Sequence, residues 1–138
     1  MPNKLKLIKK LFKRFDRHLR DNGFKAREGQ IVDASIVSAP VQRNSREENK
    51  QLKSGEVPDD WNDKKRAHKD TDARWTKKNG KARFGFKNHI QVDVKHKFIR
   101  DYDVTDTALH DSNVFHELLD ATNSNADLYA DSAYNSKR

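Results

Sequence analysis

The chain has 138 residues, of which 33% are hydrophobic and 36% charged, and its formal net charge is +8. This length corresponds to about one domain, and so basic a balance favours a polyanionic partner, most often nucleic acid. The sequence contains no cysteine, which excludes disulfide scaffolds, Cys-ligated zinc and thiol nucleophiles. Because the sequence has no apolar run of about 18 residues and no apolar leader, we expect a cytoplasmic, nucleoid-associated protein without a membrane partner.

Residues 1–23 carry the pattern of a basic amphipathic helix. Apolar side chains recur every three or four residues from Leu5 to Leu19, and lysines and arginines occupy the other faces. Gly23 is a typical C-terminal stop. The pattern predicts a helix docked on a domain, and the alternatives are a helix at a DNA backbone or at a membrane surface.

The next two segments differ sharply in composition. Residues 30–37 (QIVDASIV) are β-branched and apolar, which predicts a buried strand with Asp33 in its middle. Residues 44–82 are rich in charged side chains and hold few large apolar ones, so they are not expected to offset the entropy lost on ordering. We therefore predict a long polar insertion at about 44–82, with a short helix near residues 45–53.

Regular structure is expected to resume after this insertion. Residues 83–94 alternate apolar and polar side chains, the pattern of a half-buried strand. Residues 98–105 follow a tight connection and are predicted to form a second strand, antiparallel to the strand at 83–94. An apolar helical run occupies 114–119, and residues 126–131 predict a short buried strand that carries Asp131 at its C-terminal end.

Asp33 and Asp131 both occur in apolar strand contexts, where an unpaired carboxylate is costly to bury. A right-handed crossover after the antiparallel strands would return the last strand parallel to the first and bring the two carboxylates together. Two neighbouring carboxylates repel unless a cation lies between them, and oxygen-only ligation favours Mg²⁺ or Mn²⁺. This predicts metal-assisted attack on phosphate diesters. For either aspartate alone, the alternative is an ordinary hydrogen-bonding residue near a sheet end.

Two further sets of residues are candidates for binding. A basic cluster is expected to contact DNA phosphates with an affinity that falls as salt rises, and its alternative is a solvated loop; its members are Lys77, Lys78, Lys81, Arg83 and Lys87. Glu117, on the expected helix, is a candidate third metal ligand, and its alternative is a solvated helix face.

Three long strings in the chain carry a family resemblance: QIVDASIVSAPVQRNSREENKQ, DTDARWTKKNGKARFGFKNHIQVDVKHKFIRDYDVTDTALHDS and LYADSAY. They resemble the DDE transposases of bacterial insertion sequences, in the IS-five-like group. The resemblance implies an α/β, ribonuclease-H-like mixed sheet with three antiparallel strands, a crossover helix and a parallel fourth strand. It implies that residues 29–138 are part of the catalytic domain. Asp33 and Asp131 would be catalytic residues that bind divalent cations, cut the element's ends and join them to target DNA.

The chain departs from the family pattern at its C-terminal side. The family's third acidic residue, a Glu on a later helix, has no match here. We therefore expect a truncated transposase fragment, incomplete at the C-terminus, with little strand transfer of its own. Its last strand would be an exposed edge that invites pairing with another chain, either a second copy or a full-length transposase, and its stability would be marginal. The alternatives are a non-catalytic DNA-binding or transposase-inhibiting remnant, and a nuclease completed by Glu117.

Overall fold

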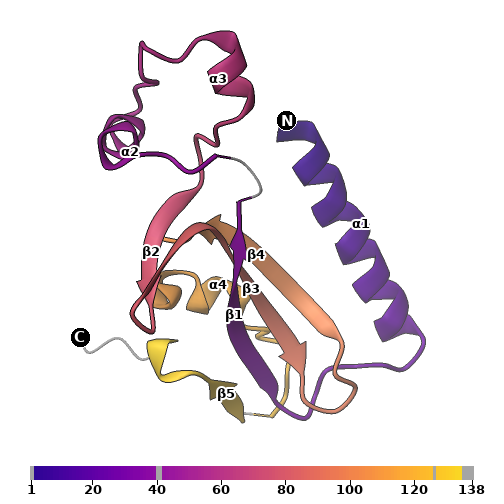
Figure 1. Ribbon diagram of the computed structural model, residues 1–138. Coiled ribbons are helices and arrows are strands. Elements are labelled where there is room, and N and C mark those ends of the chain that lie inside the picture. The colour runs from indigo at the N-terminus through magenta and orange to yellow at the C-terminus, as the bar shows by residue number, and fades with distance from the viewer. Residues whose placement is uncertain (1, 40–41, 126, 135–138) are drawn as a thin grey trace.

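The computed structural model describes residues 2–39, 42–125 and 127–134 of the chain (Figure 1). In chain order the elements are α1 (Pro2–Asp21), β1 (Gln30–Ser38), α2 (Arg46–Lys53), α3 (Asp63–Ala67), β2 (Arg74–Lys78), β3 (Lys81–Asp93), β4 (Ile99–Asp106), η1 (Asp111–Asn113), α4 (Phe115–Leu118), β5 (Leu128–Ala130) and η2 (Ser132–Tyr134). Among these helices, none is both long enough and apolar enough to cross a membrane.

All the strands join one mixed sheet, in which β3 is the longest. β1 pairs antiparallel with β3 along its whole length. β2 pairs with residues 81–85 of β3 and β4 with residues 86–92, both antiparallel. After the crossover through η1 and α4, β5 returns parallel to β1. The mixed α/β sheet expected from the sequence, with antiparallel strands and a parallel last strand, is confirmed.

β2 was not expected from the sequence, because it lies inside the range assigned to the polar insertion. It forms a hairpin with β3 through a two-residue turn at Asn79 and Gly80, whose φ angles are 52° and 76°. Two successive residues with positive φ match the right-handed twist of the flanking strands, and Asn-Gly is the pair that adopts them most readily. The polar composition of the segment therefore concealed a strand.

α2, α3 and the loops around them form a small polar lobe beyond one end of the sheet (Figure 1). The helix expected near residues 45–53 is confirmed as α2, which begins with a capping box between Ser45 and Glu48. Glu48 also accepts hydrogen bonds from Trp61 Nε1 at 2.9 Å and from Lys69 Nζ at 2.9 Å. Trp61 is 4% exposed. The expectation that this segment would lack the means to order was wrong, because one buried indole and one multiply bonded carboxylate organise it.

α1 lies alongside β4, as Figure 1 shows. The ring of Phe12 meets Tyr102 of β4 edge-on at a centroid distance of 5.0 Å. Lys9 Nζ pairs with Asp103 Oδ1 at 3.0 Å. α1 therefore docks on the sheet through both apolar and ionic contacts, although Leu11 and other apolar side chains of the helix remain exposed.

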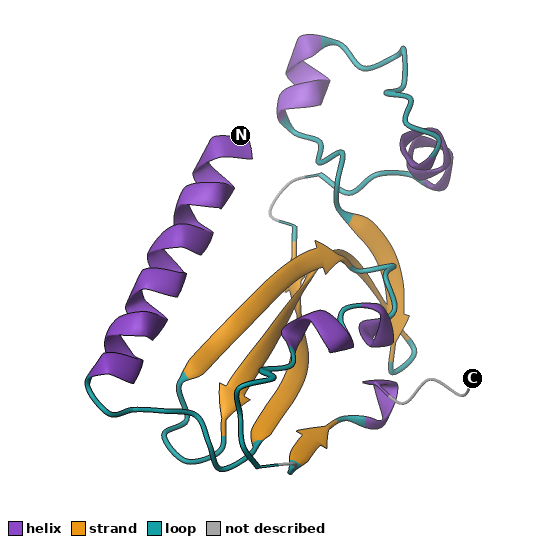
Figure 2. Cartoon of the chain, turned by 180° about the vertical axis from the view of Figure 1, so that it is seen from behind, coloured by secondary structure: helices purple, strands orange, loops and turns teal. Residues whose placement is uncertain are grey.

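The buried apolar cluster lies on the other face of the sheet, under α4, which is in front of the strands in Figure 2. It consists of Val32, Val114, Leu118 and Tyr134. The crossover helix is shorter than the apolar run predicted, since it comprises only the single turns η1 and α4. It consequently covers little of the sheet, and every residue of β5 is exposed. The expectation that the last strand would be buried was therefore wrong.

Candidate functional site

The parallel pairing of β1 with β5 decides where Asp33 and Asp131 lie. Val32 is opposite Ala130 in the last paired position of this ladder. Asp33 is the next residue within β1 and Asp131 is the residue directly after β5, and the two strands run in the same direction. Hydrogen-bonded strands lie about 4.8 Å apart, so the topology brings these two residues, remote in sequence, to neighbouring positions at one edge of the sheet.

Both aspartates are exposed, contrary to the expectation that they would be buried in apolar strands. Asp33 Oδ1 accepts a hydrogen bond from the Ala34 backbone N–H at 2.8 Å, and Asp131 Oδ1 accepts one from Ser132 Oγ at 3.1 Å. Neither carboxylate forms an ion pair with any residue that the structure describes. The desolvation argument from the sequence therefore fails, and the case for a site rests on the adjacency of two open carboxylates.

Tyr134 belongs to the buried cluster, and the charges of both aspartates act on its hydroxyl. Its side chain is buried, and its hydroxyl lies 3.5 Å from Nδ1 of the fully buried His89. Burial raises the pKa of the Tyr134 hydroxyl, and the negative charges of Asp111, Asp33 and Asp131 raise it further. Three carboxylates from three separate segments thus lie within electrostatic reach of one neutral phenol.

Asp111 is the member of this group that the sequence did not identify. An aspartate just before an apolar helical run is usually a helix cap, but the η1 cap here is the side chain of His110, which accepts from Ser112 N–H. Asp111 Oδ1 instead accepts from Lys87 Nζ at 2.8 Å, and both side chains are largely buried. No local sequence signal reports this pairing, because Lys87 belongs to a different strand.

The two carboxylates are ligands of the kind that a divalent cation uses. Two exposed carboxylates with free oxygens fit a hard cation that prefers oxygen ligands. Over the described ranges, however, no three His, Cys, Asp or Glu side chains are grouped to hold a metal ion. Glu117 is exposed on α4 and belongs to no such group, so the geometry does not favour it as a third ligand. Asp33 and Asp131 are therefore the two carboxylates at this edge that could hold such a cation.

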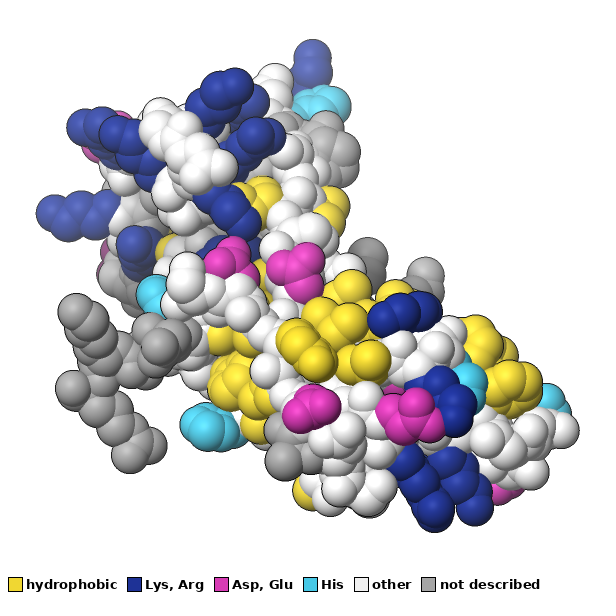
Figure 3. Space-filling model, turned by 90° about the horizontal axis from the view of Figure 1, so that it is seen from below, with side chains coloured by type: hydrophobic (Ala, Val, Ile, Leu, Met, Phe, Trp, Pro, Cys, Tyr) yellow, Lys and Arg dark blue, Asp and Glu magenta, His cyan; other side chains and the backbone are white. Residues whose placement is uncertain are grey.

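The five residues of the expected DNA-binding cluster do not share one surface. Lys78 lies opposite Lys81, and Arg83 is two residues farther along β3, so these three share one face of the hairpin. Lys77 is on the opposite face, and Lys87 is occupied by Asp111 and by the Leu109 carbonyl at 2.6 Å. Lys and Arg side chains gather most densely at one end of the molecule in the view from below (upper left in Figure 3).

Comparison with known proteins agrees with this geometry. Residues 24–138 match the family model described as Transposase DDE domain. The chain is similar to the transposase for insertion sequence element IS1106 of Neisseria meningitidis serogroup B, with 28% identity over 135 residues. That alignment covers 94% of this chain and 43% of the relative, so the chain spans less than half of that protein's length. No solved structure matches it. A mixed sheet that brings Asp33, within β1, and Asp131, just after the parallel strand β5, to neighbouring positions, together with a family match over most of the sequence, shows that this chain belongs to the DDE transposase domain family.

Proposed function

We propose that Asp33 and Asp131 form half of the metal-dependent centre with which an insertion-sequence transposase cuts and joins DNA. The observation that supports this most directly is the parallel β1–β5 register, in which Val32 and Ala130, the residues just before the two aspartates, lie opposite each other. A bound Mg²⁺ or Mn²⁺ would lower the pKa of an attacking water or hydroxyl and stabilise the charge that develops on the phosphate diester. The protein's own contribution is to hold two oxygen ligands on adjacent strands, open to a large polyanionic substrate.

The neighbouring residues suit this role. Tyr134, buried beside the two aspartates, is protonated at neutral pH, and burial raises its pKa further above the ordinary value of 10. A neutral hydroxyl adds no further negative charge to an already acidic edge. Lys87 neutralises Asp111, so that this third carboxylate is held in an ion pair beneath the site. The arrangement keeps the local negative charge on the two exposed groups.

DNA would meet the protein on the face of the β2–β3 hairpin that carries Lys78, Lys81 and Arg83. Lys78 and Lys81 lie directly across from each other, and like charges in that position destabilise a hairpin. A phosphate between them would remove the repulsion. We propose that these three cations hold the backbone of the DNA whose reacting phosphate lies at the aspartates, with an affinity that falls as salt rises.

The metal half of this proposal is tested by titrating the purified chain with Mn²⁺ and following free Mn²⁺ by electron paramagnetic resonance. We expect saturable binding that weakens at least about tenfold, or about 1.4 kcal/mol, in Asp33→Asn and in Asp131→Asn. Asp59→Asn is the matched control, since Asp59 is an exposed acid of the polar lobe. Equal Mn²⁺ affinity in the wild type and both site variants would contradict the proposal.

A further inference from the structure

A groove of about 800 Å³ opens between α2 and the β2–β3 hairpin, away from the two aspartates. Its lining comes from α2 and the residues before it, from β2, and from the start of β3; the residues that carry the argument are Arg46, Asn49, Lys50, Lys53, Trp75 and Lys77. We propose that this groove is a second DNA-binding site, which holds the phosphodiester backbone. The proposal deepens the proposed function and rests on it for the identity of the polyanion.

The cations of α2 form a row along the groove. Arg46, Lys50 and Lys53 are spaced by four and then three residues, so their side chains share one helix face. This row covers about 10 Å of helix axis, at 1.5 Å per residue. A row of cations of this length extends beyond a single phosphate group, so it matches a linear polyanion such as a DNA strand better than a single small anion.

Lys77 supplies positive charge from the opposite wall. Of the hairpin cations it is the one on the face with Trp75 and Ala82, which also line the groove. DNA lying in the groove would thus contact cations on both sides. Lys77 therefore faces this groove, whereas Lys78 lies on the opposite face of the hairpin.

The groove cations are not neutralised within the protein. Arg46, Lys50, Lys53 and Lys77 form no ion pair with any described residue. Two other lysines of the same lobe are paired: Lys65 with Asp60 at 2.7 Å, and Lys69 with Glu48 at 2.9 Å. The lobe therefore uses its buried carboxylate for internal structure and leaves positive charge on the groove side.

A second, independent observation is the side chain of Asn49. It is 8% exposed and lines the groove, yet neither its Oδ1 nor its Nδ2 has a hydrogen-bond partner in the part of the chain that the structure describes. Buried amides are almost always hydrogen-bonded. Its Nδ2 group can donate to a phosphate oxygen, so a phosphodiester backbone in the groove would give this buried donor a partner.

The indole of Trp75 lines the groove but is held by other side chains and does not offer a free face on which a base could stack. Its Nε1 donates to the Asn44 carbonyl at 2.9 Å, and the Arg43 guanidinium lies 5.5 Å from the centre of its ring. Phe84 packs against the same indole at a centroid distance of 5.3 Å. With its ring flanked by two side chains, the indole is not free to stack on a base. Recognition in this groove would therefore be of the backbone and independent of base sequence.

The proposal is tested by fluorescence anisotropy of a short labelled DNA duplex of arbitrary sequence, titrated with the full chain in EDTA at several salt concentrations. We expect the double variant Lys50→Gln/Lys53→Gln to bind at least about tenfold more weakly. The slope of log K against log salt should fall in magnitude by about 0.9 for each phosphate that the variant no longer neutralises. Lys64→Gln, on the exposed helix α3, is the matched control and should bind as the wild type does. Unchanged affinity and salt slope in the double variant would overturn the proposal.

Asn49→Leu separates binding from folding. Replacing an unpartnered buried amide with an apolar side chain of similar volume should leave the melting temperature equal or higher, while DNA affinity falls. A fall in melting temperature with unchanged DNA affinity would overturn the role given to Asn49. The anisotropy titration in EDTA measures DNA binding without divalent cations, and the Mn²⁺ titration measures the aspartates without DNA, so failure of the metal centre and failure of the groove give different results. A matching RNA duplex that bound more tightly than DNA would overturn the assignment of DNA as the ligand.

Discussion

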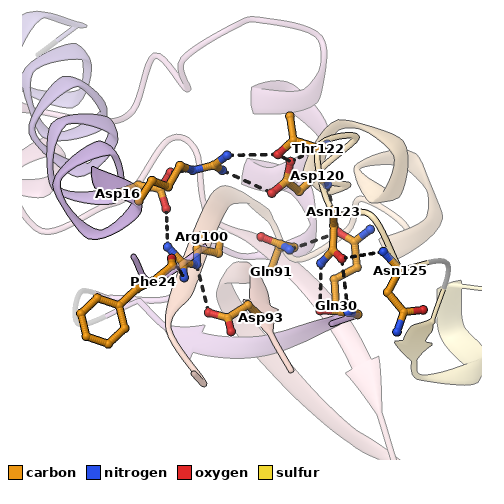
Figure 4. A network of polar contacts seen from close by, with 12 residues as sticks. Asp16, Phe24, Gln30, Gln91, Asp93, Arg100, Asp120, Thr122, Asn123 and Asn125 are labelled. Atoms are coloured by element: carbon orange, nitrogen blue, oxygen red, sulfur yellow. Dashed lines mark hydrogen bonds and ion pairs between the residues drawn. The ribbon is translucent and has the colours of Figure 1, made fainter. Parts of the chain in front are cut away.

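Asp16 of α1 and Arg100 of β4 form an ion pair at 3.0 Å although 84 positions separate them in the sequence. Arg100 is only 5% exposed, and its Nε also pairs with the buried carboxylate of Asp93 at 3.0 Å (Figure 4). Arg20, from the last turn of α1, extends the network to Asp120 at 3.2 Å. Since much of the apolar stripe of α1 is exposed, this buried polar network is a principal link between the helix and the sheet.

Removing Arg100 should therefore destabilise the fold strongly. Arg100→Met leaves the Asp93 carboxylate buried without its cation, and breaking a buried pair from one side typically costs about 3–5 kcal/mol. Urea unfolding followed by far-ultraviolet circular dichroism measures this loss. Lys9→Met is the control, because Lys9 pairs with Asp103 at the surface and such pairs contribute about 1 kcal/mol or less. Similar losses in the two variants would show that the network contributes little.

The polar lobe should be sensitive to acid through Glu48. Burial acts to raise the pKa of this carboxyl, but the Ser45 N–H, Lys69, Trp61 and Lys65 outweigh it and lower the pKa from 4.5 to about 2. A carboxyl with a lower pKa in the folded state stabilises that state above its unfolded pKa. The stabilisation should thus be complete above pH 4.5 and lost progressively as the pH falls to about 2.

Tryptophan fluorescence during urea unfolding measures this dependence, because Trp61 lies against Glu48. The midpoint should decrease across that pH interval in the wild type. In Glu48→Gln, which keeps the size of the side chain and removes its titration, the midpoint should start lower and vary less with pH. Identical pH profiles for the two proteins would contradict the assignment to Glu48.

Gly85 is required where β1, β2 and β3 meet. A Cβ atom at this position would lie 2.1 Å from the Val37 carbonyl oxygen and 2.8 Å from the Ala39 backbone nitrogen. Gly85→Ala should force the strands apart and cost about 1–3 kcal/mol or more. Gly55→Ala, where a Cβ atom meets open space, should cost only the backbone strain of about 1–2 kcal/mol. Amide hydrogen exchange of Ala39, which donates to the Phe84 carbonyl, should accelerate in the Gly85 variant alone.

The elements that could be predicted from the sequence are those whose signal is local or follows from chain topology. Alternating side chains in residues 83–94 identified β3, and the handedness of crossovers predicted the parallel return that places Asp131 beside Asp33. The Asn79–Gly80 turn was also a local signal, overlooked because the surrounding composition is polar. The exposure of Asp33 could not be predicted, since it depends on which parts of the sheet α1 and α4 leave uncovered.

The exposed edge formed by β5 should promote self-association. Among the described residues β5 pairs with β1 alone, over three positions, and Tyr129 at its centre is 55% exposed. An unpaired edge with an exposed aromatic side chain can add a strand from another chain, and a charged side chain there prevents it. Sedimentation velocity should show an average mass that rises with concentration in the wild type and rises less in Tyr129→Lys. Val57→Lys, at an exposed hydrophobic residue of the polar lobe (40% exposed), should behave as the wild type does. A wild type that stays monomeric throughout the concentration series would contradict this role of the β5 edge.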